Sequence, residues 1–127
     1  MLSVISVIDD NASVRAATNN LLSSHGYSVH TFESAEDFLQ SAHQDDSSCV
    51  VADVQMPGMS GLDLLTRLRT RGNNVPFIFI TAFPDEGVRA RALKAGAICF
   101  LSKPFPGPVL INYIEGALNQ PPGGAGK

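Results

Sequence analysis

The sequence has no long hydrophobic run, no excess of positive charge and few cysteines, and each shortage excludes a class of protein. No apolar stretch in the 127 residues is long enough to cross a bilayer as a helix, so no membrane association is expected. Nine Lys and Arg residues against twelve Asp and Glu give a formal net charge of -3, which argues against direct binding of nucleic acid. The chain start lacks the basic segment of a signal peptide and there are only two cysteines, so a reducing cytoplasm is the expected location.

The chain has the length of one ordinary domain, and its hydrophobic content of 44% is sufficient for a packed core. We predict a single domain over residues 1–120. Residues 121–127 are rich in proline and glycine and poor in core-forming side chains, so they are predicted to form a linker or tail.

Short runs rich in β-branched and aromatic residues alternate with segments whose apolar residues recur at helical spacing. The predicted strands are residues 4–8, 27–32, 49–53, 75–81 and 97–101. The predicted helices are 12–25, 34–42, 60–71, 85–95 and 109–119, with Ala17, Ala42 and Tyr113 among the residues expected to face inward. The helix at 85–95 is poor in large apolar residues, so it is expected to be weakly anchored.

Strands that alternate with helices predict an α/β fold with a five-stranded parallel, doubly wound sheet. We predict the strand order 2-1-3-4-5, which places the topological switch point between the first and third strands. In this order Cys49 and Cys99 are two strand spacings apart, roughly 10 Å, which exceeds disulfide reach. Both cysteines are therefore expected to be core thiols.

Carboxylates stand at the carboxyl ends of two predicted strands. Asp9 and Asp10 follow the first strand and Asp53 ends the third, so the switch point brings all three into one crevice. Three adjacent carboxylates repel one another, and a site with oxygen ligands alone favours Mg²⁺ over zinc as the compensating cation. The simpler alternative is that Asp53 caps the turn formed by Pro57 and Gly58.

The fourth and fifth strands lead to a hydroxyl and an ammonium group. Thr81 and Lys103 carry donors suited to the equatorial oxygens of a transferring phosphoryl group, and Asp53 would be the nucleophile that forms an aspartyl phosphate. As alternatives, Thr81 satisfies a strand end and Lys103 is a solvated charge. The second alternative is disfavoured, because a lysine directly before Pro104 is conformationally restricted.

Several motifs, taken in order, resemble the receiver domain of two-component response regulators. They are Asp9-Asp10, Asp53 with Met56-Pro57-Gly58-Met59-Ser60-Gly61, Thr81-Ala82 and Lys103-Pro104-Phe105, and the resemblance spans about residues 3–119. Ala95-Gly96-Ala97 and Ser102-Lys103-Pro104-Phe105 are similar to the FixJ-type subgroup. The resemblance implies the CheY-like, flavodoxin-like fold.

The resemblance also implies which residues hold the metal. Asp53 resembles the phosphoacceptor, and Asp10, Asp53 and the backbone carbonyl of Gln55 resemble the Mg²⁺ ligands. Asp9 resembles the carboxylate that supports the ion through water.

Four further residues match positions of the phosphorylation switch. Thr81 resembles the switch hydroxyl and Phe100 the switch aromatic. Lys103 resembles the phosphate-binding lysine, and the peptide bond between Lys103 and Pro104 is cis in the family.

The implied function is a phosphorylation switch rather than an enzyme, apart from the domain's own phosphorylation and dephosphorylation. A sensor histidine kinase is the expected partner, and the fourth helix, fifth strand and fifth helix are the expected response surface and homodimer contact. The expected output is transcription through a separate C-terminal DNA-binding domain. The alternative is a stand-alone or phosphorylation-independent receiver that binds proteins; a haloacid-dehalogenase-like phosphatase is disfavoured because it needs Asp-x-Asp where this chain has Asp9-Asp10-Asn11.

Two residues are expected to influence the lifetime of the phosphoryl group. Gln55 and Phe83 stand two residues beyond Asp53 and Thr81, at positions that flank the approach of water in the family. Gln55 could orient a water molecule, whereas Phe83 could exclude one. We expect exclusion to dominate and the phosphoprotein to be long-lived.

Overall fold

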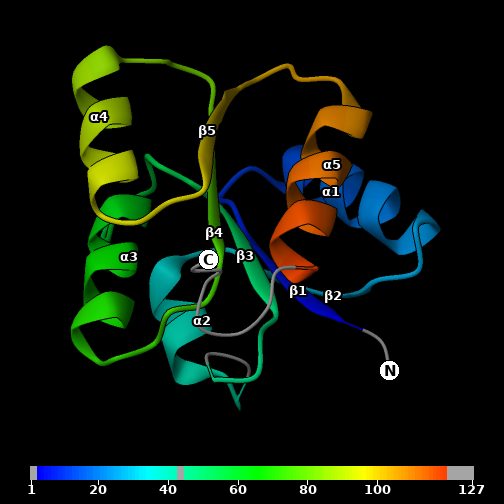
Figure 1. Ribbon diagram of the computed structural model, residues 1–127, viewed down its shortest axis with the longest axis horizontal. Coiled ribbons are helices and arrows are strands. Elements are labelled where there is room, and N and C mark those ends of the chain that lie inside the picture. Colours follow the sequence, from blue (N-terminus) through cyan, green and yellow to red (C-terminus); the bar gives the residue numbers. More distant parts are fainter. Residues whose placement is uncertain (1–2, 43–44, 120–127) are drawn as a thin grey trace.

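The computed structural model describes residues 3–42 and 45–119, which form a sheet between two layers of helices (Figure 1). The strands are β1 (Val4–Ile8), β2 (Ser28–Phe32), β3 (Cys49–Asp53), β4 (Phe77–Thr81) and β5 (Cys99–Ser102). The helices are α1 (Ala12–Ser24), α2 (Ala35–Gln40), α3 (Gly61–Thr70), α4 (Glu86–Lys94) and α5 (Gly107–Leu118). The predicted alternation of strands and helices is confirmed.

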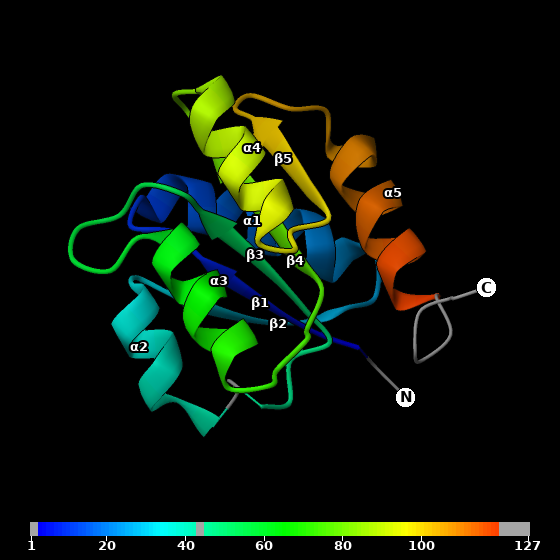
Figure 2. The same cartoon turned by 60° about the vertical axis from the view of Figure 1, so that its left-hand side comes forward.

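All strand pairs are parallel and the sheet order is β2-β1-β3-β4-β5, as predicted. Helices α1 and α5 cover one face, and α2, α3 and α4 cover the other (Figures 1 and 2). Strand β2 is added on one side of β1, and β3, β4 and β5 are added on the other side. The loops that follow β1 and β3 therefore run to opposite faces of the sheet and leave a crevice between them.

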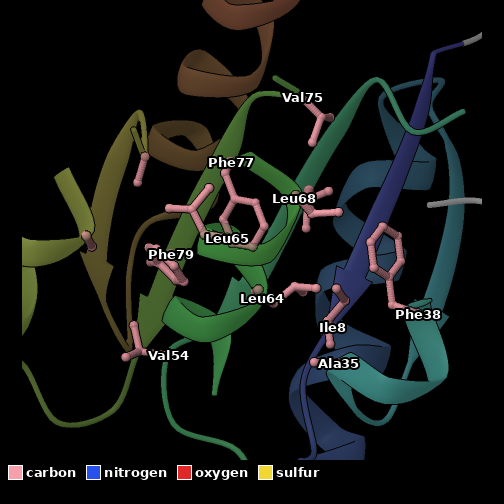
Figure 3. Packing of buried hydrophobic residues seen from close by; sticks show 14 of the residues in the cluster. Ile8, Ala35, Phe38, Val54, Leu64, Leu65, Leu68, Val75, Phe77 and Phe79 are labelled. Carbon is pink, nitrogen blue, oxygen red and sulfur yellow. The ribbon is translucent and has the colours of Figure 1, made fainter. Parts of the chain in front are cut away.

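The central strand shows how the core is divided. Every residue of β3 is buried, and its side chains alternate between the two faces. Val50 and Ala52 pack toward α2, α3 and α4, where Phe77 and Phe79 of β4 complete the core shown in Figure 3. Such burial on both faces is typical of parallel sheets and explains the continuous apolar run.

Both cysteines are buried and free, as predicted. Cys49 lies in β3 and Cys99 in β5, and β4 pairs with both strands and separates them. Burial raises the pKa of Cys49 to about 12 and that of Cys99 to about 11, so both remain neutral core thiols at physiological pH.

The helical faces differ from the prediction at two positions. Ala17 is exposed, because the buried stripe of α1 runs through Thr18 and Leu22. Tyr113 is also exposed, because α5 buries Ile111 instead, together with residues 110 and 114. The predictions for Leu22, Leu110 and Ile114 are confirmed, since all three are buried. Only the edge of each buried stripe differs, and a helical period alone does not determine it.

The ends of several elements also differ. The prediction for Ala42 is wrong, since α2 ends at Gln40, where the Ser41 hydroxyl donates to the Phe38 carbonyl at 2.7 Å, and Ala42 is exposed. Strands β2, β4 and β5 begin one or two residues later than predicted, and α5 begins two residues earlier. The predicted tail, residues 121–127, lies outside the described residues. Within residues 3–42 and 45–119, the helices are too short or too polar to span a membrane.

Candidate functional site

The carboxyl ends of four strands deliver the predicted site residues to one edge of the sheet. Asp9 follows β1 and is fully buried, while the next residue, Asp10, is exposed. Asp53 ends β3 and Thr81 ends β4, and these two residues are 7% and 1% exposed. Lys103 follows β5, and its backbone N–H donates to the Thr81 carbonyl at 2.7 Å. All five residues therefore meet where the parallel strands end.

Lys103 joins two of the carboxylates. Its Nζ lies 3.0 Å from Oδ2 of Asp9 and 3.0 Å from Oδ2 of Asp53. Both carboxylates are nearly buried, so their repulsion is strong unless a cation lies between them. The ammonium group of Lys103 provides part of that compensation.

The other oxygen of each buried carboxylate is held by the backbone. Oδ1 of Asp9 accepts the N–H of Asn11, and Oδ1 of Asp53 accepts the N–H of Gln55, each at 2.9 Å. Nη1 of Arg15 donates to the carbonyl oxygen of Asp9 at 2.7 Å and so connects α1 to the loop that carries the acidic pair. The two carboxylates are therefore fixed in orientation before any ligand binds.

The pKa values reflect this environment. Burial raises the pKa of Asp53, and the hydrogen bonds from Gln55 and Lys103 offset the effect only in part. Burial lowers the pKa of Lys103, but its bonds to Asp53 and Asp9 outweigh that effect and the pKa is raised overall. Lys103 is therefore firmly protonated. A second cation beside Asp53 would favour the ionised, nucleophilic form of the Asp53 carboxylate.

The donor set fits a magnesium ion. Asp9, Asp10 and Asp53 each offer a carboxylate oxygen, and these atoms lie within 4.8 Å of one another. The set contains oxygen only, and two of its members are already constrained by backbone donors, as Mg²⁺ requires for its strict geometry. The backbone carbonyl of Gln55 is a further expected ligand, and Gln55 lines the cavity that lies above these carboxylates.

The cavity above the carboxylates is large enough for a phosphoryl group and hydrated ion. It has a volume of about 370 Å³ and is lined by Asp10, Asn11, Asp53, Gln55, Thr81, Ala82, Phe83 and Lys103. The Thr81 hydroxyl accepts the backbone N–H of Phe83 at 3.1 Å, and the Phe83 side chain is 72% exposed at the rim. The Lys103–Pro104 peptide bond is cis.

Phe100 is not part of this cavity. It is half-buried on the side of the sheet covered by α4, and its ring centroid lies 6.5 Å from that of Phe79. The residue is thus one strand away from Thr81, in a position to respond to movement of β4 or α4.

Four residues at the site were not assigned to it from the sequence. Asn11 and Gly61 occur in the sequence motifs quoted above, but neither was given a role at the site. Arg15 and Glu36 carry no signal in the sequence pattern, because each reaches the site's loops from a helix with a long side chain. Of these four residues, only Asn11 could have been found from the sequence, because it directly follows the two acidic residues at the end of the first strand.

Comparison with known proteins agrees with this geometry. A family model described as the response regulator receiver domain matches residues 5–115. Nodulation protein W of Bradyrhizobium diazoefficiens is 42% identical over 118 residues, which cover 93% of this chain and 52% of that protein. The transcriptional regulatory protein FixJ of the same organism is 40% identical over 116 residues, or 91% of this chain and 57% of FixJ.

Solved structures give the same result. The crystal structure of FixJ-N superposes with a TM-score of 0.83 and 37% identity, covering 93% of this chain and 94% of that one. A CheY-like receiver domain from Methanospirillum hungatei has a TM-score of 0.86 at 24% identity, which speaks for the fold alone. The chain spans about half the length of the curated relatives that it matches. It belongs to the response regulator receiver domains of two-component systems.

Proposed function

We propose that this receiver domain is activated by phosphorylation of Asp53, with a phosphohistidine of a sensor histidine kinase as the donor. The observation that carries the proposal is the position of Asp53. Its nearly buried carboxylate lies at the base of an open cavity, 3.0 Å from the Lys103 ammonium and close to Asp9 and Asp10. A carboxylate that only capped the following turn would need neither the lysine nor the other two acids.

The residues divide the chemistry among them. An Asp53 oxygen attacks phosphorus, the bond between phosphorus and the histidine nitrogen breaks, and the electron pair leaves with the imidazole. Lys103 and the Thr81 hydroxyl donate to the phosphoryl oxygens as negative charge develops on them. Bound Mg²⁺, held by Asp10, Asp53 and the Gln55 carbonyl with Asp9 behind a water, would neutralise charge on the same oxygens.

The proposed response is a shift of α4, β5 and α5. Helix α4 buries only Ala92 completely, so little apolar contact holds it in place. Movement of Thr81 toward the phosphoryl group would leave room for Phe100, which packs beneath α4. The rearranged surface is the proposed homodimer contact.

We also propose that the output is transcriptional. The support is that FixJ, which this chain matches over 57% of its length, is described as a transcriptional regulatory protein. The full reading frame beyond Lys127 would test this part of the proposal, because a DNA-binding segment is required.

Asp53→Asn tests the central step, because the amide keeps the shape of the carboxylate but is not a nucleophile. We expect acetyl phosphate and Mg²⁺ to add one phosphate to the wild type and none to this variant, as measured by intact mass. Asp63→Asn, which changes an exposed carboxylate in α3, is the control and is expected to be labelled normally. Labelling of the Asp53→Asn variant would refute the assignment, and a wild type that is never labelled would favour the phosphorylation-independent alternative.

A further inference from the structure

The loop between β3 and α3, residues 54–60, is fixed at both ends. At its start the N–H of Gln55 donates to Asp53, and the buried Met56 side chain packs in the core. At its end the N–H of Gly61 donates to the carbonyl of Val54 at 2.9 Å. Between these points the chain turns through exposed residues, where fewer contacts would hold it.

A side chain from α2 holds the middle of this loop. Oε2 of Glu36 accepts the backbone N–H of Met59 at 2.9 Å, although the two residues are 23 positions apart in the sequence. This contact ties the loop that follows the phosphoacceptor to a neighbouring helix, and α2 and α3 lie side by side in Figure 2.

Gly58 makes the contact possible. Its φ of +79° is a conformation that other residues rarely adopt, and it turns the loop toward α2. A Cβ at this position would lie 2.7 Å from Oε2 of Glu36 and would push the carboxylate away. The glycine therefore supplies both the turn and the space for the carboxylate.

Helix α2 is a firm base for this contact. Ala35 and Phe38 on either side of Glu36 are fully buried, and the rings of Phe38 and Phe32 meet edge to face at 5.3 Å. The Ser34 side chain caps the helix, and a carboxylate in the first turn interacts favourably with the helix dipole. Glu36 is therefore carried by a helix that is itself anchored in the core.

We propose that Glu36 is a positioning residue for the magnesium and phosphoryl site, acting through the loop at residues 54–60. The inference rests on the proposed function, since it concerns the same site. The loop carries Gln55, whose N–H orients Asp53 and whose carbonyl is the proposed metal ligand. Without the contact to α2 the loop is held at its two ends alone, so both groups of Gln55 are less strictly ordered. The ion must then order them further when it binds, and its affinity falls.

Glu36→Ala removes the contact, and two further variants separate its effect from general changes. Glu36→Gln keeps an oxygen that can accept the Met59 N–H but removes the charge. Asp37→Ala removes an exposed carboxylate from the same helical turn, with the same effect on helix charge. The measurements are the dissociation constant for Mg²⁺ by calorimetry and the hydrogen exchange of the Met59 amide by NMR, both on the full chain.

We expect Glu36→Ala to weaken Mg²⁺ binding about fivefold, the equilibrium effect of losing one net hydrogen bond of about 1 kcal/mol, and to remove protection of the Met59 amide. We expect Glu36→Gln and Asp37→Ala to bind Mg²⁺ and protect Met59 as the wild type does. Wild-type Mg²⁺ affinity in Glu36→Ala, or equal weakening in Asp37→Ala, would overturn the positioning role. A wild type that does not bind Mg²⁺ would instead overturn the proposed function, and the positioning role with it.

Discussion

Nζ of Lys103 lies 3.0 Å from Oδ2 of Asp53, although the two residues are 50 positions apart in the sequence. The contact forms because β3 and β5 both end at the same edge of the sheet and only β4 separates them. The lysine is the counter-ion of a buried carboxylate. Under the proposed function it would also donate to the phosphoryl oxygens after phosphorylation.

Removal of this ammonium group is expected to slow phosphorylation. Lys103→Met retains most of the aliphatic stem but leaves Asp9 and Asp53 without their shared cation. We expect labelling by acetyl phosphate to be slower by about tenfold or more, as for loss of other charge-stabilising donors. Lys94→Met, at an exposed position of α4, is the control. Equal labelling rates in the two variants would show that Lys103 does not act on the reacting group.

The stability of the metal-free protein is expected to depend on the titration of Asp53. Its folded pKa is raised above the ordinary value of 3.8, mainly by burial, so the folded state binds this proton more tightly than the unfolded chain does. The resulting stabilisation is fully present below pH 3.8 and is lost as the pH rises through the folded pKa.

We therefore expect the free energy of unfolding of the wild type, relative to that of Asp53→Asn, to fall as the pH increases from 3.8 through the folded pKa of Asp53. Above that pKa the difference is expected to level off. Urea denaturation in EDTA at a series of pH values measures the difference. A difference that grows with pH would mean that the bond from Lys103 outweighs burial.

Gly61 is expected to tolerate no side chain. A Cβ there would overlap the carbonyl oxygen of Asp53 and lie 2.9 Å from the Phe79 ring. We expect Gly61→Ala to lower the free energy of unfolding by about 1–3 kcal/mol, the usual cost of overpacking, and to slow labelling. Gly116→Ala, in a helix with nothing within 4 Å, is expected to raise stability by up to about 1 kcal/mol. If the two variants unfold alike, the backbone at Gly61 has room to move.

The Phe83 ring is expected to restrict the access of water to the aspartyl phosphate. The ring is exposed at the rim of the cavity, so its truncation opens the approach without disturbing the core. We expect Phe83→Ala to lose its phosphate faster than the wild type in Mg²⁺, with each ~1.4 kcal/mol of barrier equal to a factor of ten. Decay followed by intact mass provides the rate. An unchanged or slower decay would place Phe83 on the output surface instead.

Phosphorylation is expected to change the dynamics of residues 82–105. This segment includes α4, which buries only Ala92 completely, and the half-buried Phe100. We expect faster or slower amide exchange there and a larger sedimentation coefficient as dimers form. Unchanged exchange in this segment, with an unchanged sedimentation coefficient, would contradict the proposed switch surface.

Much of the architecture was predictable from local patterns. The β-branched runs and helical periodicity indicate the elements, and their alternation leads to a parallel sheet. Because parallel strands all end at one edge, the positions of Asp9, Asp53 and Thr81 at strand ends were sufficient to predict that they meet. None of these inferences required knowledge of how a side chain packs.

Contacts between distant segments required the tertiary structure. The pattern of α5 did not distinguish Ile111 from Tyr113 as the buried residue, because the rotation of a helix depends on what it packs against. The hydrogen bond from the Met59 N–H to Glu36 depends on the spacing between α2 and a loop, and on a glycine that leaves room for the carboxylate. The raised pKa of Asp53 follows from burial. Such features depend on distances between elements, and those are set only when the helices pack onto the sheet.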